Sequence, residues 1–98
     1  MNTLISIKST DQIKKAVSAR ELYEFLEIAE RFSRWFDRMR EYGFAENIDY
    51  VRYESFNALA RQSLQDYFVT IDMAKEISMI QRSDKGKQAR QYFLECER

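Results

Sequence analysis

The sequence contains no proline, no histidine, two glycines and one cysteine among its 98 residues. Without a proline- or glycine-rich stretch there is no sign of an internal linker, so we expect a single domain over residues 1–98. One cysteine cannot form a disulfide within the chain, and the lack of histidine excludes a Cys/His metal site. A single cysteine without a disulfide framework is typical of a protein from a reducing compartment. No apolar run approaches the roughly 18 residues of a membrane span and no signal-peptide layout is present, so we expect a cytoplasmic protein.

The charges balance, because 16 lysines and arginines face 16 aspartates and glutamates. No overall basic field therefore draws the protein onto nucleic acid, and any DNA affinity must come from local clusters. General acid and base catalysis at neutral pH usually recruits histidine, and no glycine-rich phosphate loop is present. We expect neither an enzyme nor a bound cofactor.

Residues 17–42 show the clearest helical pattern of the chain. Ser18 precedes Glu21 by three residues, the spacing of a capping box, in which the hydroxyl accepts from the Glu21 amide and the carboxylate reaches back to the Ser18 amide. Two apolar stripes follow at helical spacing, out of phase with each other. They are Ala19, Leu22, Phe25, Leu26 and Ala29, and then Phe32, Trp35, Phe36, Met39 and Gly43. We predict two short helices joined by a tight turn, a helix-turn-helix.

The outward surface of the second predicted helix is rich in arginine. In a helix-turn-helix this helix enters the major groove, and arginine suits both phosphate contacts and bidentate reading of guanine. The candidate DNA contacts are Arg31, Ser33, Arg34, Arg38 and Arg40. An ordinary solvated face is the alternative, because acidic residues are interspersed and a pair such as Glu30 with Arg34 would look the same.

The N-terminal residues alternate weakly in the manner of strands. We expect residues 4–8 and 13–17 to form a small hairpin across the turn residues 9–12, packed against the first helix. The alternative is a frayed N-terminus in which only residues 13–17 are ordered. Gly43 is placed to end the second helix, since glycine accepts a left-handed backbone at no steric cost.

After Gly43 the pattern becomes that of strands. Residues 48–54 and 66–71 are β-branched and aromatic, which predicts an antiparallel hairpin. Between them, residues 55–65 suit a longer connection, or a short helical turn at residues 56–61. Such a hairpin would be the wing of a winged helix, with Arg52 and Arg61 as candidate phosphate contacts. A hairpin that only covers the core is the alternative.

Two further helices are predicted in the C-terminal part. Thr70 and Asp72 supply a cap and an acidic first turn for a helix over residues 72–80. Its expected buried face is Met73, Ala74, Ile77 and Ile80, and that of the last helix is Ala89, Tyr92, Phe93 and Cys96. A basic stretch, residues 82–90, straddles the start of the last helix, where an anion is favoured. Its Lys85, Lys87 and Arg90 are the second set of candidate phosphate contacts, the alternative being a solvated connector.

Two long strings carry a family resemblance: VSARELYEFLEIAERFSRWFDRMREYGFAENIDY, residues 17–50, and TIDMAKEISMIQRSDKGKQARQYFLECE, residues 70–97. The joint signature of SARELYEFLE, FSRWF, EYGF, DMAKE and KGKQARQYF closely resembles the AntA/AntB antirepressor family of bacteriophages and prophages. The segment 51–68 is shorter than in many members, which often carry a basic or glycine-rich insert there. The resemblance implies a phage regulatory protein that relieves repression of lytic genes in a bacterial host.

These observations together predict an α+β domain of winged helix-turn-helix type, with about four helices and one or two small antiparallel hairpins. The expected partner is double-stranded DNA. The alternative is a protein-interaction module that binds a phage repressor or self-associates without touching DNA. Helix-turn-helix proteins often dimerise, so a homodimer through the last helix or the N-terminal hairpin is also expected. Family members often carry this module ahead of a second domain, which leaves a module of a longer protein and a short stand-alone version both open.

Overall fold

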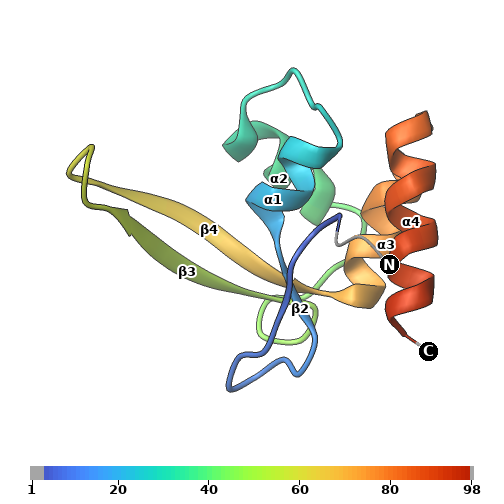
Figure 1. Ribbon diagram of the computed structural model, residues 1–98, viewed down its shortest axis with the longest axis horizontal. Helices are drawn as coiled ribbons and strands as arrows, with labels where there is room; N and C mark the ends of the chain where they lie inside the picture. Colours follow the sequence, from blue (N-terminus) through green and yellow to red (C-terminus); the bar gives the residue numbers. More distant parts are fainter. Residues whose placement is uncertain (1–3, 98) are drawn as a thin grey trace.

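Alternating strand and helix signals produce an α+β fold with four helices and one four-stranded antiparallel sheet. The computed structural model describes residues 4–97. In chain order the elements are β1 (Ile7–Lys8), β2 (Ala16–Ser18), α1 (Ala19–Phe25), α2 (Phe32–Arg40), β3 (Tyr50–Asn57), β4 (Gln62–Thr70), α3 (Ile71–Ile80) and α4 (Asp84–Cys96). The helices gather at one end of the sheet, and the β3–β4 hairpin extends away from them into solvent (Figure 1).

The strands lie in the order β1-β2-β4-β3, and every pair is antiparallel. The predicted N-terminal hairpin is confirmed, with Ile7 opposite Val17, although its strands are shorter than expected. β2 also pairs with the distant strand β4, where Val17 lies opposite Val69. This long-range pairing fixes the start of α1 beside the base of the β3–β4 hairpin.

The β3–β4 hairpin confirms the predicted pairing but is longer than predicted. Its register runs from Tyr50 opposite Val69 to Asn57 opposite Gln62, which leaves only residues 58–61 as the connection. The expected long connection over residues 55–65, and the helical turn within it, are therefore wrong. The ladder continues because each additional antiparallel pair satisfies backbone groups that a loop would leave to water.

The helix pair forms at the predicted positions, but its connection differs. Ser18 caps α1 by accepting from the amide of Glu21, as expected. The reciprocal half of the capping box is absent, since the buried Oε2 of Glu21 has no hydrogen-bond partner in the described chain. Residues 26–31, including Glu27 in the left-handed region at φ 55°, join α1 to α2. This connection is longer than the three or four residues of a typical helix-turn-helix turn, so the predicted tight turn is wrong.

The remaining helix boundaries follow the predicted signals. The Thr70 hydroxyl accepts from the amide of Met73 at the start of α3, and Gly43 takes the left-handed conformation, φ 104°, after α2. α3 and α4 approach each other closely, because a Cβ built on Gly86 would lie 2.3 Å from the carbonyl oxygen of Ser78. None of the helices within residues 4–97 is long and apolar enough to cross a membrane.

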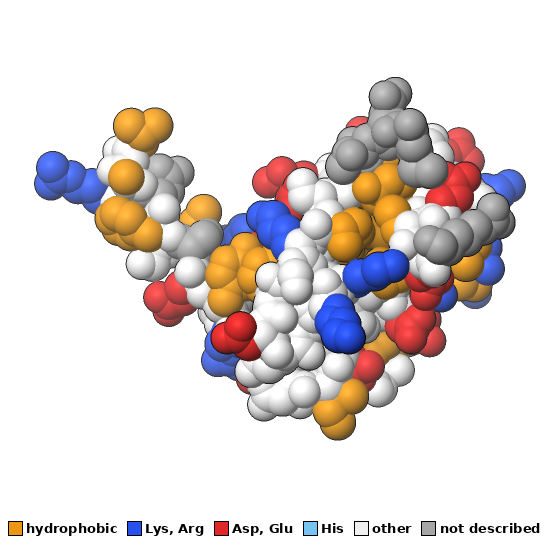
Figure 2. All heavy atoms as spheres, turned by 60° about the horizontal axis from the view of Figure 1, so that its bottom comes forward, with side chains coloured by type: hydrophobic (Ala, Val, Ile, Leu, Met, Phe, Trp, Pro, Cys, Tyr) orange, Lys and Arg blue, Asp and Glu red, His pale blue; other side chains and the backbone are white. Residues whose placement is uncertain are grey.

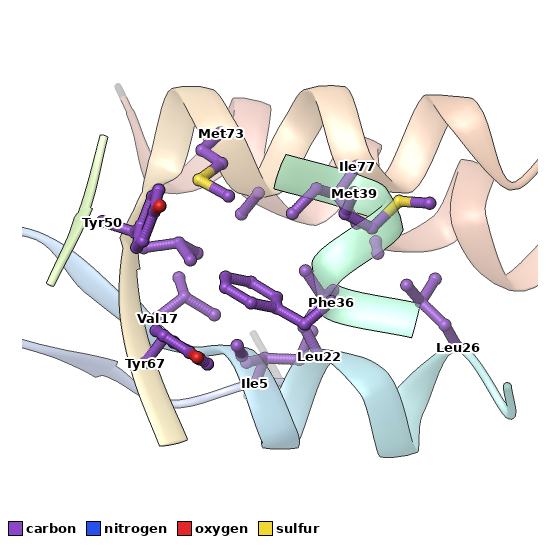
Figure 3. Close-up of a cluster of buried hydrophobic side chains, with 14 of the residues drawn as sticks. Ile5, Val17, Leu22, Leu26, Phe36, Met39, Tyr50, Tyr67, Met73 and Ile77 are labelled. Carbon is purple, nitrogen blue, oxygen red and sulfur yellow. The ribbon is translucent and has the colours of Figure 1, made fainter. Parts of the chain in front are cut away.

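The core forms where α2 packs on the helix-bearing face of the sheet (Figure 3). The predicted inward stripe of α2 is confirmed, since Phe32, Trp35, Phe36 and Met39 are all buried. The Phe36 ring stacks on that of Tyr67 with 4.1 Å between centroids. The predicted stripes of α3 and α4 are also buried, except that Ile80 and Cys96 lie at the rim and are half-buried.

Candidate nucleic-acid interface

The orientation of α2 is set by contacts on its buried side. The indole Nε1 of Trp35 donates to Oε1 of Gln81 at the end of α3, at 3.5 Å. The Gln81 amide donates in turn to the carbonyl of Ile77 at 2.8 Å. Because Trp35 is fully buried, these contacts hold α2 in one rotation about its axis. Gln81 carries no sequence signal for this positioning role, since it lies on no apolar stripe.

Three predicted contact residues stand together at the start of α2. Arg31 is the N-cap residue, Ser33 and Arg34 lie in the first turn, and all three are exposed. Their side chains form no hydrogen bond or ion pair with any residue from 4 to 97. The first turn contains no acidic residue and Arg31 makes no side-chain cap. The positive end of the helix dipole and two free guanidinium groups therefore favour an anion at the same place.

The other two predicted arginines of α2 are engaged within the protein. Arg38 donates to Oε1 of Glu30 at 2.6 Å, and this hydrogen bond raises the pKa of the guanidinium above its ordinary value. Arg40 pairs with Asp37, and its guanidinium lies 5.7 Å from the centre of the Tyr67 ring. Both contacts would have to compete with DNA, so these residues are less available than Arg31 and Arg34.

The basic residues of α4 have three different environments. The ammonium group of Lys85 lies 5.0 Å from the centre of the Phe25 ring at the end of α1. Lys87 is exposed and has no hydrogen bond or ion pair with the described chain. Arg90 is half-buried in a groove beside α3 that is also lined by acidic side chains, Asp49, Asp72 and Glu76. Of the three, Lys87 is the most available to a phosphate.

The start of α4 lies at the same end of the molecule as the α1–α2 connection (Figure 1). The contact between Lys85 and Phe25 joins these two regions directly. The structure therefore brings the basic stretch of α4 towards the helix pair, which the sequence alone did not indicate.

The candidate wing carries few free charges. Arg52 lies 4.0 Å from a carboxylate oxygen of Glu46, and Arg61 is exposed in the turn at the tip. The side chains that stand out on the distal hairpin are apolar: Leu59 is 99% exposed and Phe56 is 69% exposed. Figure 2 shows hydrophobic groups on the protruding hairpin and, over the body in that view, lysines and arginines scattered among acidic side chains.

Comparison with known protein families matches residues 17–83 to AntA, the AntA/AntB antirepressor family. The matched segment runs from β2 to the residue before α4 and includes the β3–β4 hairpin. Neither the curated proteins nor the solved structures gave a significant match to this chain. Because the family match covers more than half of the chain, the protein belongs to the AntA/AntB antirepressor family.

Proposed function

We propose that this domain is a phage or prophage antirepressor module that binds double-stranded DNA through a winged helix-turn-helix. In this assignment α1 and α2 are the helix pair, α2 is the recognition helix, and the β3–β4 hairpin takes the place of the wing. The observation that carries the proposal is that Arg31 and Arg34 are exposed and have no hydrogen bond or ion pair with residues 4–97, at the positive end of a helix whose inward face is buried in the core. Such a regulator acts in the cytoplasm of the bacterial host and needs neither a catalytic step nor a cofactor.

The start of α2 supplies the reading surface. In the major groove, Arg34 can donate two hydrogen bonds to the O6 and N7 atoms of a guanine, while Arg31 and Ser33 contact the backbone or a neighbouring base. Lys87 then acts as a phosphate anchor at the same end of the molecule. Because the net charge is zero, affinity depends on these few groups, and it should fall steeply with salt.

The test is binding to random-sequence and operator duplexes at two salt concentrations, measured by fluorescence anisotropy. Arg31→Ala/Arg34→Ala should abolish specific binding and flatten the slope of log affinity against log salt by roughly one unit for each lost phosphate contact. Arg38→Ala is the matched control. It removes an arginine from the same helix, but the charge of this arginine is already neutralised by Glu30.

Two results would count against the DNA-binding proposal. One is no binding of the wild type to any duplex at low salt. The other is a double variant whose affinity and salt slope match those of the Arg38→Ala control, because that would show that the start of α2 makes no special contribution.

A repressor protein is the second candidate partner. Zero net charge favours it, because specific DNA-binding domains usually present a strong basic surface. The internal pairing of Arg38 and Arg40 points in the same direction. Addition of the domain to a repressor–operator complex separates the two candidates. Release of the repressor at a salt concentration where the domain does not bind DNA would support the protein partner.

A further inference from the structure

β3 is one of the two edge strands of the sheet, and much of its outer edge has no partner among residues 4–97. The amide of Thr70 donates to the carbonyl of Asp49, which sets the phase of the β3–β4 ladder. Antiparallel pairing alternates, so the backbone groups of Arg52 and Glu54 point away from β4. At Tyr50 the edge is already closed, because the amide of Asn47 donates to its carbonyl at 2.7 Å. The open part of the edge therefore begins after Tyr50.

The exposed charges on this edge are self-complementary. Arg52 and Glu54 lie two residues apart on one face of the strand. If a second copy pairs antiparallel about a two-fold axis at Tyr53, Arg52 of each copy lies opposite Glu54 of the other. Their outward backbone groups then face each other as hydrogen-bonded pairs, and both side-chain contacts are attractive.

Neighbouring registers do not have this property. An axis at Arg52 would place the two arginines opposite each other, and an axis at Glu54 would do the same for the two glutamates, which is destabilising. Among the residues that the structure describes, the side chain of Arg52 is held only by the 4.0 Å contact with Glu46, between two exposed side chains. Such a pair contributes little, so Arg52 can exchange partners at small cost.

The same register covers the exposed apolar side chains of the hairpin. Beyond Glu54 the hairpin of one copy leaves the paired edge, because Asn47 closes the edge at Tyr50 of the other copy, and it passes over residues 44–49 of that copy. Leu59 and Phe56 then reach the neighbourhood of Ile48, which is 72% exposed. The two-fold axis repeats this contact, so both protruding tips lose their exposure to water together.

We propose that a second copy of this chain docks on the open edge of β3, from Arg52 to Glu54, and forms a two-fold dimer with one continuous eight-stranded sheet. Each hairpin tip lies over the loop before β3 of the other copy. This interface uses neither the last helix nor the N-terminal hairpin, and it stands whether or not α2 binds DNA. The contact is isologous, because the same edge is used by both copies.

The test uses charge reversal followed by mixing, with the whole chain in sedimentation equilibrium. Arg52→Glu makes both edge positions acidic, and Glu54→Arg makes both basic, so each variant alone should dimerise at least about tenfold more weakly than the wild type. An equimolar mixture should recover the wild-type affinity as a heterodimer, and the double swap R52E/E54R should recover it as a homodimer. Lys14→Glu, an exposed charge reversal elsewhere, is the control.

Recovery of dimerisation on mixing shows that the single variants are folded. Mixing removes neither substitution, so a chain that could not fold alone would still be unable to dimerise. A wild type that stays monomeric at concentrations on the order of 100 μM would overturn the proposal, since its dissociation constant would then be too weak to matter. So would a dimer that neither single reversal weakens. If both reversals leave a monomer unchanged while Arg52→Glu weakens DNA binding and Glu54→Arg strengthens it, the hairpin contacts DNA and not a second copy.

Discussion

Asp66 is a buried carboxylate that links three parts of the fold. It lies on β4, is 3% exposed, and accepts four hydrogen bonds. Two come from backbone amides, of Arg20 at 3.0 Å and of Tyr67 at 2.7 Å. The other two come from the hydroxyls of Ser18 at 2.5 Å and Tyr53 at 3.0 Å. Asp66 therefore ties the start of α1 to both strands of the hairpin.

We predict that Asp66→Ala strongly destabilises the domain. The amides of Arg20 and Tyr67 would lose their carboxylate acceptor, and each donor left unsatisfied costs about 1–3 kcal/mol. The two amides together therefore lower the free energy of unfolding by roughly 2–6 kcal/mol, against a total of about 5–15 kcal/mol for a typical domain. The hydroxyls add less, because they can rotate towards other acceptors.

Asp66→Asn is the matched control for this prediction. Its side-chain carbonyl can still accept from both amides, and its NH₂ group can donate to the hydroxyl oxygens. The control should therefore recover much of the lost stability. The remaining loss reflects the negative charge, because hydrogen bonds to a charged acceptor are stronger than neutral ones.

Urea unfolding followed by fluorescence measures both variants. Trp35 is the sole tryptophan and is fully buried, so its emission reports on the core directly. The reasoning is refuted if Asp66→Ala unfolds within about 1 kcal/mol of the wild type with the same m-value, because the two amides would then have found other partners.

Two more predictions concern Tyr53 and Gly86. Burial and the adjacent charge of Asp66 raise the pKa of Tyr53 to about 12, so the folded state binds this proton more tightly than the unfolded state does. The resulting stabilisation is complete below pH 10 and is lost as the pH rises to 12. The free energy of unfolding should therefore fall less steeply between pH 10 and 12 in Tyr53→Phe than in the wild type. Equal pH slopes of the free energy from chemical unfolding would contradict a role of Tyr53 in this loss. Gly86→Ala should destabilise by about 1–3 kcal/mol in thermal unfolding, despite the better helix propensity of alanine, because the new Cβ would lie 2.3 Å from the Ser78 carbonyl oxygen. An unchanged or higher melting temperature would show that α3 and α4 can separate at no cost.

Local patterns in the sequence determined which segments become helices and which face each helix buries. The stripe Phe32, Trp35, Phe36 and Met39 places four apolar side chains on one side of a 3.6-residue period, so burial of that side follows from periodicity. Capping by Ser18 and Thr70 is equally local, since the hydroxyl and the amide it accepts from are three residues apart. The sequence also predicted that the two strands of the hairpin pair. It did not predict how long the hairpin is, because extension of the ladder depends on both strands at once.

Tertiary structure alone decided which charged groups are available. The four candidate arginines of α2 look equivalent in sequence. Glu30 and the aromatic cluster engage Arg38 and Arg40, however, while Arg31 and Arg34 have no partner among the described residues. The role of Asp66 is likewise invisible in sequence, because its partners on β2, α1 and β3 are brought together only by long-range pairing. Helix formation depends on neighbours three and four residues away, whereas the environment of a charge depends on whichever distant segments fold against it.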